Sequence, residues 1–447
     1  MWLHDLWDEE VALCKQFANA VHPHVAHVAL TCVCRRWRDI ALNLTPFWTS
    51  YYFLEQYHLP HCTGQADATY VKQWMERTGD RPMNIIIHSR RQYTLRAVFQ
   101  KLLVDYTARV VSVHLVLYGD THSAFLLDLS SMPNLEKVTI RTHRTCWIPS
   151  KPLTVLENSL SLKHVALETL AGQAVVPTLP WSQLQSLSFK AHYNPFSLDT
   201  RAVLNILQHC QSLRSFSFVK LSTCDGIFES ADAFMENPVV HVTHHSLRTL
   251  VLSADRNVTP PAVGHFDGDR VAKVDVSELL AGLTAPNLQS FDYRWVIREE
   301  FEALESFLHR SSYNLKSLNI LPAGSVDIRD SALLSFQKPP PLPHLEELFL
   351  SSSVDESFTD ALADSSSMMC PNLRRISIQI KRQISAKALV SILRSRTYDI
   401  PQDAGVVRLD FVDLIYFKGR KRHIPKEELC RMQQAGTVIV ARRKRRT

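Results

Sequence analysis

The chain has 447 residues, more than one ordinary globular core holds, so we expect either several domains or an extended array of repeats. Hydrophobic residues make up 45% of it and charged residues 21%, which argues against wholesale disorder. The formal net charge of +6 sits almost entirely in the five basic residues 442–446, and removing them leaves +1. The rest of the chain therefore carries too little positive charge for a nucleic-acid groove.

The first predicted element is an amphipathic helix within residues 30–48. Its apolar side chains fall on one helical face, at Leu30, Val33, Cys34, Trp37, Ile40 and Ala41. Pro46 should end this helix, and Trp48 is placed to fold back onto it.

The string V-C-R-R-W-R-D-I-A at residues 33–41, followed by Pro46 and Trp48, resembles the second half of an F-box. That module docks onto a Skp-type adaptor and, through it, a cullin of a ubiquitin ligase. The Leu-Pro-x-Glu string that usually opens an F-box is missing from residues 1–29, so the first half is atypical. The resemblance implies an F-box-like helical segment over residues 1–55. It also implies adaptor contacts at Val33, Cys34, Trp37, Ile40, Pro46 and Trp48.

Residues 56–80 are predicted to form a linker helix. Within them, residues 69–79 contain Val71, Trp74, Met75 and Arg77. This run resembles the linker helix found in many fungal F-box proteins.

A short apolar pattern then recurs along the chain: an anchor residue followed by apolar residues three and five positions later. Leu135, Val138 and Ile140 form one such copy. Nine copies begin with leucine, at Leu135, Leu162, Leu184, Leu213, Leu247, Leu288, Leu315, Leu345 and Leu373. Weaker copies start at Pro82, Val110 and Val406, and the mean step between anchors is roughly 29 residues.

Positions +3 and +5 from the anchor lie on one face of a strand, because side chains alternate along it. One unit cannot bury this face alone, whereas stacked units can. Apolar residues at helical spacing lie between several strands, around residues 202–207, 301–308 and 388–393. The alternation predicts an α/β fold in which parallel strands line one side.

The pattern resembles irregular leucine-rich repeats, and we assign residues 81–415 to such a solenoid. The asparagine or cysteine that the family's commonest consensus places at +8 is missing from every leucine-anchored copy. The side-chain ladder that this residue normally supplies is therefore in question. A small F-box-like helical segment followed by an irregular leucine-rich-repeat solenoid is typical of substrate-receptor F-box proteins.

Positions +2, +4 and +6 point outward from the predicted strands and are candidates for binding a target protein. We select Arg141, Glu168, Lys190, Asp292, Arg294, Phe349, Arg375 and Gln379. Their mixed charges favour a protein partner over a uniform polyanion.

Residues 416–447 are predicted to be a basic C-terminal tail, either a nuclear-import signal or a solvated end. Nine cysteines without a paired framework and no secretory signal predict a reducing compartment, either cytoplasm or nucleus. No apolar run is long enough to span a membrane. Histidine and cysteine groups lack metal-ligand spacing, so we expect no metal site and no cofactor.

No catalytic motif stands in the sequence, so we do not expect an enzyme. The favoured hypothesis is a substrate-recognition subunit of a Skp–cullin–F-box ubiquitin ligase that binds an unknown target through the repeat surface. The alternative is a ligase-independent leucine-rich-repeat scaffold, in which a decayed F-box caps the hydrophobic end of the array.

Overall fold

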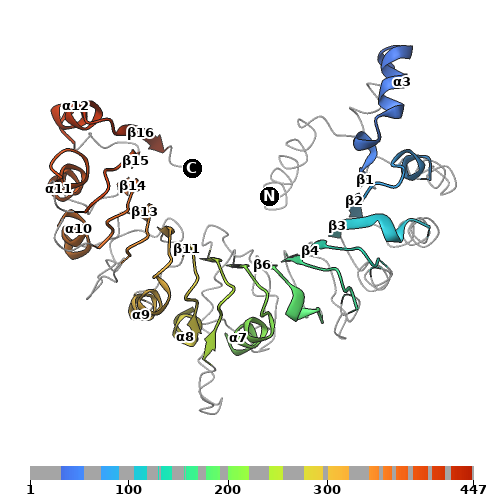
Figure 1. The fold of residues 1–447 in the computed structure, drawn as a ribbon, viewed down its shortest axis with the longest axis horizontal. Helices are drawn as coiled ribbons and strands as arrows, with labels where there is room; N and C mark the ends of the chain where they lie inside the picture. The colour runs from blue at the N-terminus through green and yellow to red at the C-terminus, as the bar shows by residue number, and fades with distance from the viewer. Residues whose placement is uncertain are drawn as a thin grey trace, which may run out of the picture. The chain divides into compact units, whose positions relative to one another are not determined.

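A computed structural model describes residues 32–54, 72–89, 105–117, 129, 132–142, 156, 158–169, 178–191, 200–220, 241–254, 276–294, 301–321, 342–351, 356–364, 369–380, 386–400, 405–417 and 424–444. The chain divides into two compact units. Figure 1 labels their helices and strands. The first consists of residues 1–168 and 177–180, and the second of residues 169–176 and 181–447.

In the first unit, helix α3 (Arg35–Asn43) and the short 3-10 helix η1 (Thr45–Trp48) precede a run of parallel strands. A further 3-10 helix, η2 (Thr107–Arg109), leads into the third strand. The strands lie side by side in chain order: β1 (Ser50–Leu54), β2 (Met83–Ser89), β3 (Val110–Leu117), β4 (Lys137–Thr142) and β5 (His164–Thr169).

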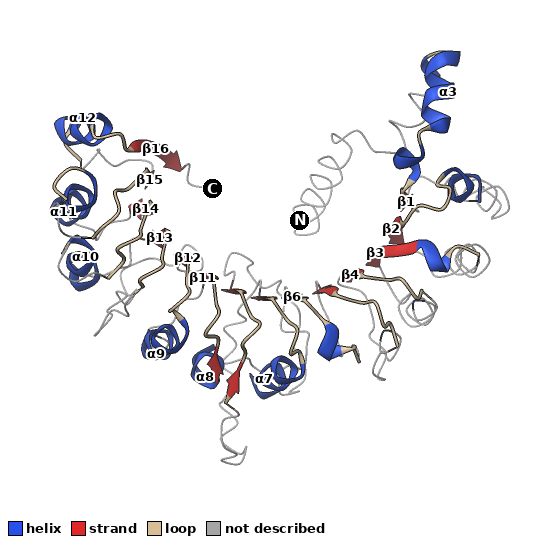
Figure 2. Cartoon of the chain, in the orientation of Figure 1, coloured by secondary structure: helices blue, strands red, loops and turns tan. Residues whose placement is uncertain are grey.

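The second unit continues the same alternation of strand and helix (Figure 2). Its main strands are parallel neighbours: β6 (Ser186–Ala191), β7 (Ser215–Lys220), β9 (Thr249–Ala254), β11 (Ser290–Arg294), β12 (Ser317–Leu321), β13 (Glu347–Ser351), β14 (Arg375–Ile380), β15 (Phe411–Phe417) and β16 (Val438–Lys444). The 3-10 helix η5 (Trp181–Gln183) precedes β6. Between the strands lie α7 (Thr200–His209), α8 (Val276–Gly282), α9 (Phe301–Ser311), α10 (Glu356–Ala363), α11 (Ala386–Thr397) and α12 (Lys426–Gln434). A two-stranded parallel pair, β8 (Val242–Thr243) with β10 (Leu283–Thr284), accompanies them.

The predicted repeat pattern forms the core. In all nine leucine-anchored copies, the anchor and its +3 and +5 residues are buried, with at most 7% of any of these side chains exposed. The weaker copy at Val110 is also confirmed, since the anchor, Val113 and Leu115 are all buried. At Pro82 the prediction holds only for Ile85 and Ile87, because Pro82 itself is exposed. The predicted helices are confirmed as α7, α9 and α11. The fold is an α/β array of stacked leucine-rich-repeat units.

The last predicted copy has the wrong register. Val406 and Phe411 are only half-buried, whereas Leu409, Val412 and Leu414 are fully buried. The anchor is therefore Leu409, three residues later than predicted. Pairing of β15 with β14 explains the choice, because it places Val412 beside the buried Ile376.

Two predicted boundaries also differ from the structure. The array begins before residue 81, since β1 pairs with β2 in register, with Tyr51 beside Ile85. The predicted basic tail from residue 416 contains α12 and β16, and β16 pairs with β15. The prediction of a tail is therefore wrong for residues 424–444, because the apolar Val438–Val440 run pairs as a strand even though basic residues follow it.

A side-chain ladder does join the repeats, at the position just before the anchor. The Asn134 Nδ2 donates to the Ala108 carbonyl at 2.6 Å, and the Asn314 Nδ2 donates to the Pro286 carbonyl at 3.0 Å. Asn287 and Asn372 make the same contact to the preceding unit. Each bond satisfies a carbonyl in the turn that enters the neighbouring strand, which replaces the missing ladder at +8.

At the C-terminal end, Glu428 of α12 fixes that helix to α11. Its carboxylate accepts hydrogen bonds from the Arg394 guanidinium and from the Tyr398 hydroxyl, while only 7% of its side chain is exposed. Arg394 first, and Tyr398 next, lower the pKa of Glu428 from 4.5 to about 2.

We predict that Asn314→Ala lowers the stability of the chain by about 1 kcal/mol, because the Pro286 carbonyl loses its donor. Urea unfolding of the full chain measures this as a lower midpoint. Asn205→Ala is the matched control, since Asn205 is exposed on α7. Equal midpoints for the Asn314 and Asn205 variants would contradict a structural role for the ladder.

We also predict a pH dependence at Glu428. Because the folded-state pKa lies below the ordinary value, the carboxylate stabilises the folded chain fully above about pH 5 and loses that effect as the pH falls from 4.5 to about 2. The difference in urea midpoint between the natural chain and Glu428→Gln should be constant above pH 5 and shrink below it. A difference that does not change with pH would refute this account of α12.

Candidate interaction surfaces

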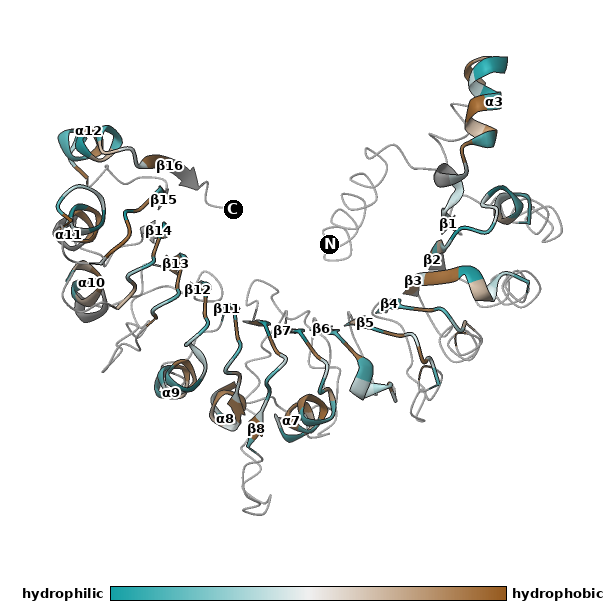
Figure 3. Cartoon of the chain, viewed as in Figure 1, coloured by the Kyte–Doolittle hydropathy of each residue, from teal (hydrophilic) through white to brown (hydrophobic). Residues whose placement is uncertain are grey.

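Helix α3 exposes the apolar side chains predicted to bind an adaptor. Within it Trp37 is 49% exposed and Ile40 50%, while Val33 before its start is 63% exposed and Leu44 just beyond its end is 39% exposed. The structure buries Ala41 alone among the residues of α3. Figure 3 shows hydrophobic residues interspersed with hydrophilic ones along this helix. Exposed large apolar side chains grouped on one short helix are typical of a protein-binding surface.

The helix is shorter than predicted at its start. Cys34 has an extended backbone, with φ −161° and ψ 171°, and so caps α3 from outside it. The Cys34 side chain is exposed, but it does not continue the helical face of Trp37 and Ile40. At the other end the prediction is confirmed: α3 stops at Asn43, Pro46 opens η1, and the Trp48 indole N–H donates to the Ala41 carbonyl at 2.9 Å. The Pro46 side chain lies outside the described residues.

Trp48 lies in the core instead of on the α3 surface. It is 3% exposed and stands three residues before the buried Tyr51, the relation of an anchor to its strand. Its ring meets the buried Trp74 edge-on at 4.6 Å between centroids, and the Trp74 indole N–H donates to the Trp48 carbonyl at 2.8 Å. Arg77 lies over the Trp48 ring, 4.8 Å from its centroid.

Trp74 belongs to the segment predicted as a linker helix, of which residues 72–77 are helical and most of the remainder lies outside the described residues. This helix connects β1 to β2 and is therefore the helical part of the first repeat. The resemblance assigned Trp48 to adaptor contact, but its burial leaves almost no side chain available for one.

In the first unit, the two candidate target contacts pair with each other. The Arg141 Nε lies 3.7 Å from a Glu168 carboxylate oxygen on the next strand, with 24% and 18% of the two side chains exposed. Burial first, and the charge of Arg141 second, lower the pKa of the neighbouring His114. These residues stabilise the strand face, and the ion pair leaves little net charge for a partner.

The candidates in the second unit are also largely paired. Arg294 makes two hydrogen bonds to Asp292, at 2.9 and 2.7 Å, and this carboxylate raises the pKa of Arg294. The Asn319 amide donates to the same carboxylate at 3.0 Å. Arg375 lies 3.0 Å from Glu347.

Lys190 of β6 and Phe349 of β13 are half-buried on the same outward strand face, five strand steps apart. The Gln379 side chain lies outside the described residues. The structure therefore places these candidates along the strands without gathering them into one site.

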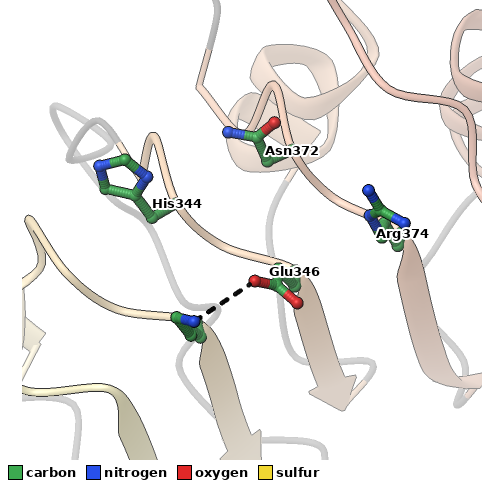
Figure 4. Close-up of a pocket in the computed structure, with 5 residues that line it drawn as sticks. His344, Glu346, Asn372 and Arg374 are labelled. Atoms are coloured by element: carbon green, nitrogen blue, oxygen red, sulfur yellow. Dashed lines mark ion pairs between the residues drawn. The ribbon is translucent and has the colours of Figure 1, made fainter.

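A pocket of about 220 Å³ lies where three successive repeats enter their strands (Figure 4). It is lined by Lys316, His344, Glu346, Asn372 and Arg374. The Lys316 ammonium lies 3.8 Å from Glu346, and the Asn372 amide donates to the Pro343 carbonyl at 2.6 Å. These residues immediately follow or precede an anchor, so the repeat register could have identified them, although we selected only outward strand positions.

Tyr313 extends this surface. It is 69% exposed, and its ring meets the His344 ring edge-on at 5.5 Å between centroids. Exposed aromatic rings beside a mixed-charge pocket suit a polar peptide rather than a small apolar ligand.

Within the described ranges, no group of three or more histidine, cysteine, aspartate or glutamate residues is arranged to hold a metal ion. Among the same residues, no helix is both long and apolar enough to cross a lipid bilayer.

Comparison with protein-family models and with curated proteins gave no match. Among solved structures, the chain is similar to a yeast structure described as the complex of Rad7 and Elc1. The alignment covers 98% of each chain, with 12% sequence identity and a TM-score of 0.38. The leucine-rich-repeat fold itself follows from the parallel strand pairing and the burial of the repeat pattern.

Proposed function

We propose that this chain is a substrate-recognition subunit of a Skp–cullin–F-box ubiquitin ligase. Its α3 segment would hold a Skp-type adaptor, and its repeat surface would hold a target protein for ubiquitination by other subunits. The chain then contributes proximity, and the chemistry belongs to its partners.

The observation that carries this proposal is the exposure of Trp37 and Ile40 on α3. Because about half of each side chain is exposed, covering that half would contribute roughly 1 kcal/mol each. The same residues are those that the F-box resemblance assigns to adaptor contact. A partner that covers them would recover this free energy.

The repeat surface supports the second half of the proposal. Its charged side chains carry both signs and are largely paired, as in Arg294–Asp292 and Arg375–Glu347. A mixed, hydrogen-bonding surface of this kind favours a protein target over a uniform polyanion.

The ligase-independent scaffold stays the second candidate. It is favoured by the burial of Trp48 and Trp74, because these residues close the first repeat as a cap would. In that case α3 is an appendage of the cap, and no adaptor binds.

We predict that purified full-length chain captures a Skp-type adaptor, and that Trp37→Ala or Ile40→Asp weakens capture at least tenfold. The reason is that large apolar residues at an interface centre each contribute more than about 1.4 kcal/mol. The dissociation constant is measured by surface plasmon resonance with immobilised adaptor.

Leu160→Ala is the matched control, since Leu160 is 84% exposed on the first unit but far from α3 in sequence. It should bind the adaptor as the natural chain does. No binding by the natural chain, or equal binding by all variants, would reject the ligase proposal in favour of the scaffold.

A further inference from the structure

The residue that directly follows each anchor forms what we term the post-anchor row, at the point where each strand begins. In the second unit this row runs, strand by strand, through Gln185, Arg214, Arg248, Gln289, Lys316, Glu346, Arg374 and Asp410. Backbone bonds join its members directly. The Arg214 carbonyl accepts the Arg248 N–H at 2.8 Å, and the Arg248 carbonyl accepts the Gln289 N–H at 2.8 Å.

Arg214 and Arg248 are therefore neighbours in space. They precede β7 and β9, which pair in register with Ser215 beside Thr249. Adjacent strands lie about 4.8 Å apart, so the two arginine side chains start from neighbouring backbone positions.

Other adjacent charges in post-anchor rows have opposite signs. Lys163 lies 2.7 Å from Glu136 in the first unit. In the second unit, Lys316 lies 3.8 Å from Glu346, and Arg374 lies 3.9 Å from Asp410. In each case the neighbouring repeat supplies the counter-charge.

The Arg214–Arg248 pair breaks this rule. Both side chains are exposed, and neither forms an ion pair with any residue in the described ranges. Like charges on neighbouring strands destabilise a sheet unless an anion lies between them. The next members of the row on either side, Gln185 and Gln289, are uncharged.

The surroundings of the pair offer hydrogen-bonding groups without negative charge. The position after the row carries a hydroxyl on five successive strands, at Ser186, Ser215, Thr249, Ser290 and Ser317. The glutamine amides beside the arginines can bond a peptide backbone.

We propose that Arg214 and Arg248 bind two carboxylates of a short acidic segment in a partner protein. The planar guanidinium group forms two parallel hydrogen bonds to a carboxylate, which suits one carboxylate on each arginine. This inference names a site and a partner chemistry for the target binding proposed above, and it rests on that function.

The acidic segment of the partner must be short, because the charge along the post-anchor row changes from positive to negative. Beyond Lys316 come Glu346, at the next post-anchor position, and Glu347, at the start of β13. A long polyanion laid along the row would meet these carboxylates. Nucleic acid needs an extended line of cations along its phosphates, which this row does not provide.

The test uses full-length chain and a fluorescent peptide containing six consecutive glutamates, with a six-glutamine peptide as the uncharged probe. Fluorescence anisotropy at low salt should show binding of the glutamate peptide alone. The double variant Arg214→Gln with Arg248→Gln should weaken that binding by about tenfold or more. Arg81→Gln, which removes an exposed arginine outside the post-anchor row, should change it less than about twofold.

Three results would overturn the site. They are no binding of the glutamate peptide, equal binding by the double variant, and tighter binding of a single-stranded oligonucleotide of equal charge through the same two arginines. Because α3 is untouched in these variants, adaptor capture should persist in all of them. Loss of the acidic site is thereby distinguished from failure of the ligase proposal.

Discussion

Each repeat presents three apolar side chains, at the anchor and at +3 and +5, that its neighbours must cover. Burying each contributes roughly 1.5–3 kcal/mol, and no unit can do so alone. Parallel pairing then keeps the strands in register, as Leu318 beside Leu348 illustrates. The asparagine ladder adds directional bonds at the turn before each strand. Because the anchor, +3 and +5 side chains form the buried core, the side chains at +1, +2, +4 and +6 can be charged and can bind a partner.

The separation between buried core positions and outward positions explains where the candidate surfaces lie. Helix α3 precedes Trp48, the first anchor among the described residues, and the Trp48–Trp74 contact packs that repeat. The apolar face of α3 is therefore not needed by the repeats and stays exposed. Along the second unit, most outward charges are balanced by the next repeat, so an unbalanced pair such as Arg214 and Arg248 stands out as a place for a partner.

Much of the fold follows from the sequence because period-two burial is a strong local signal. All nine leucine-anchored copies were found in this way, whereas the register at Val406 was not, since Leu409, Val412 and Leu414 satisfy the same spacing and only strand pairing decides. The basic residues at the end of the chain led to the prediction of a tail, although the apolar residues just before them begin strand β16. The F-box resemblance correctly located an exposed apolar helix but not the burial of Trp48. Ion pairs such as Arg294–Asp292 depend on side-chain conformations that spacing does not predict.

The repeats pack without a partner, whereas the exposed apolar face of α3 is left for one to cover. Hydrogen–deuterium exchange of the full-length chain, with and without a Skp-type adaptor, tests this contrast directly. The account predicts that amides of the paired strands, such as β7 and β9, exchange slowly in the free chain and are unchanged by the adaptor. Amides within Arg35–Asn43 should exchange quickly until the adaptor is added and then become protected. Equal protection of α3 with and without the adaptor, or strands that become protected only on its addition, would contradict the account.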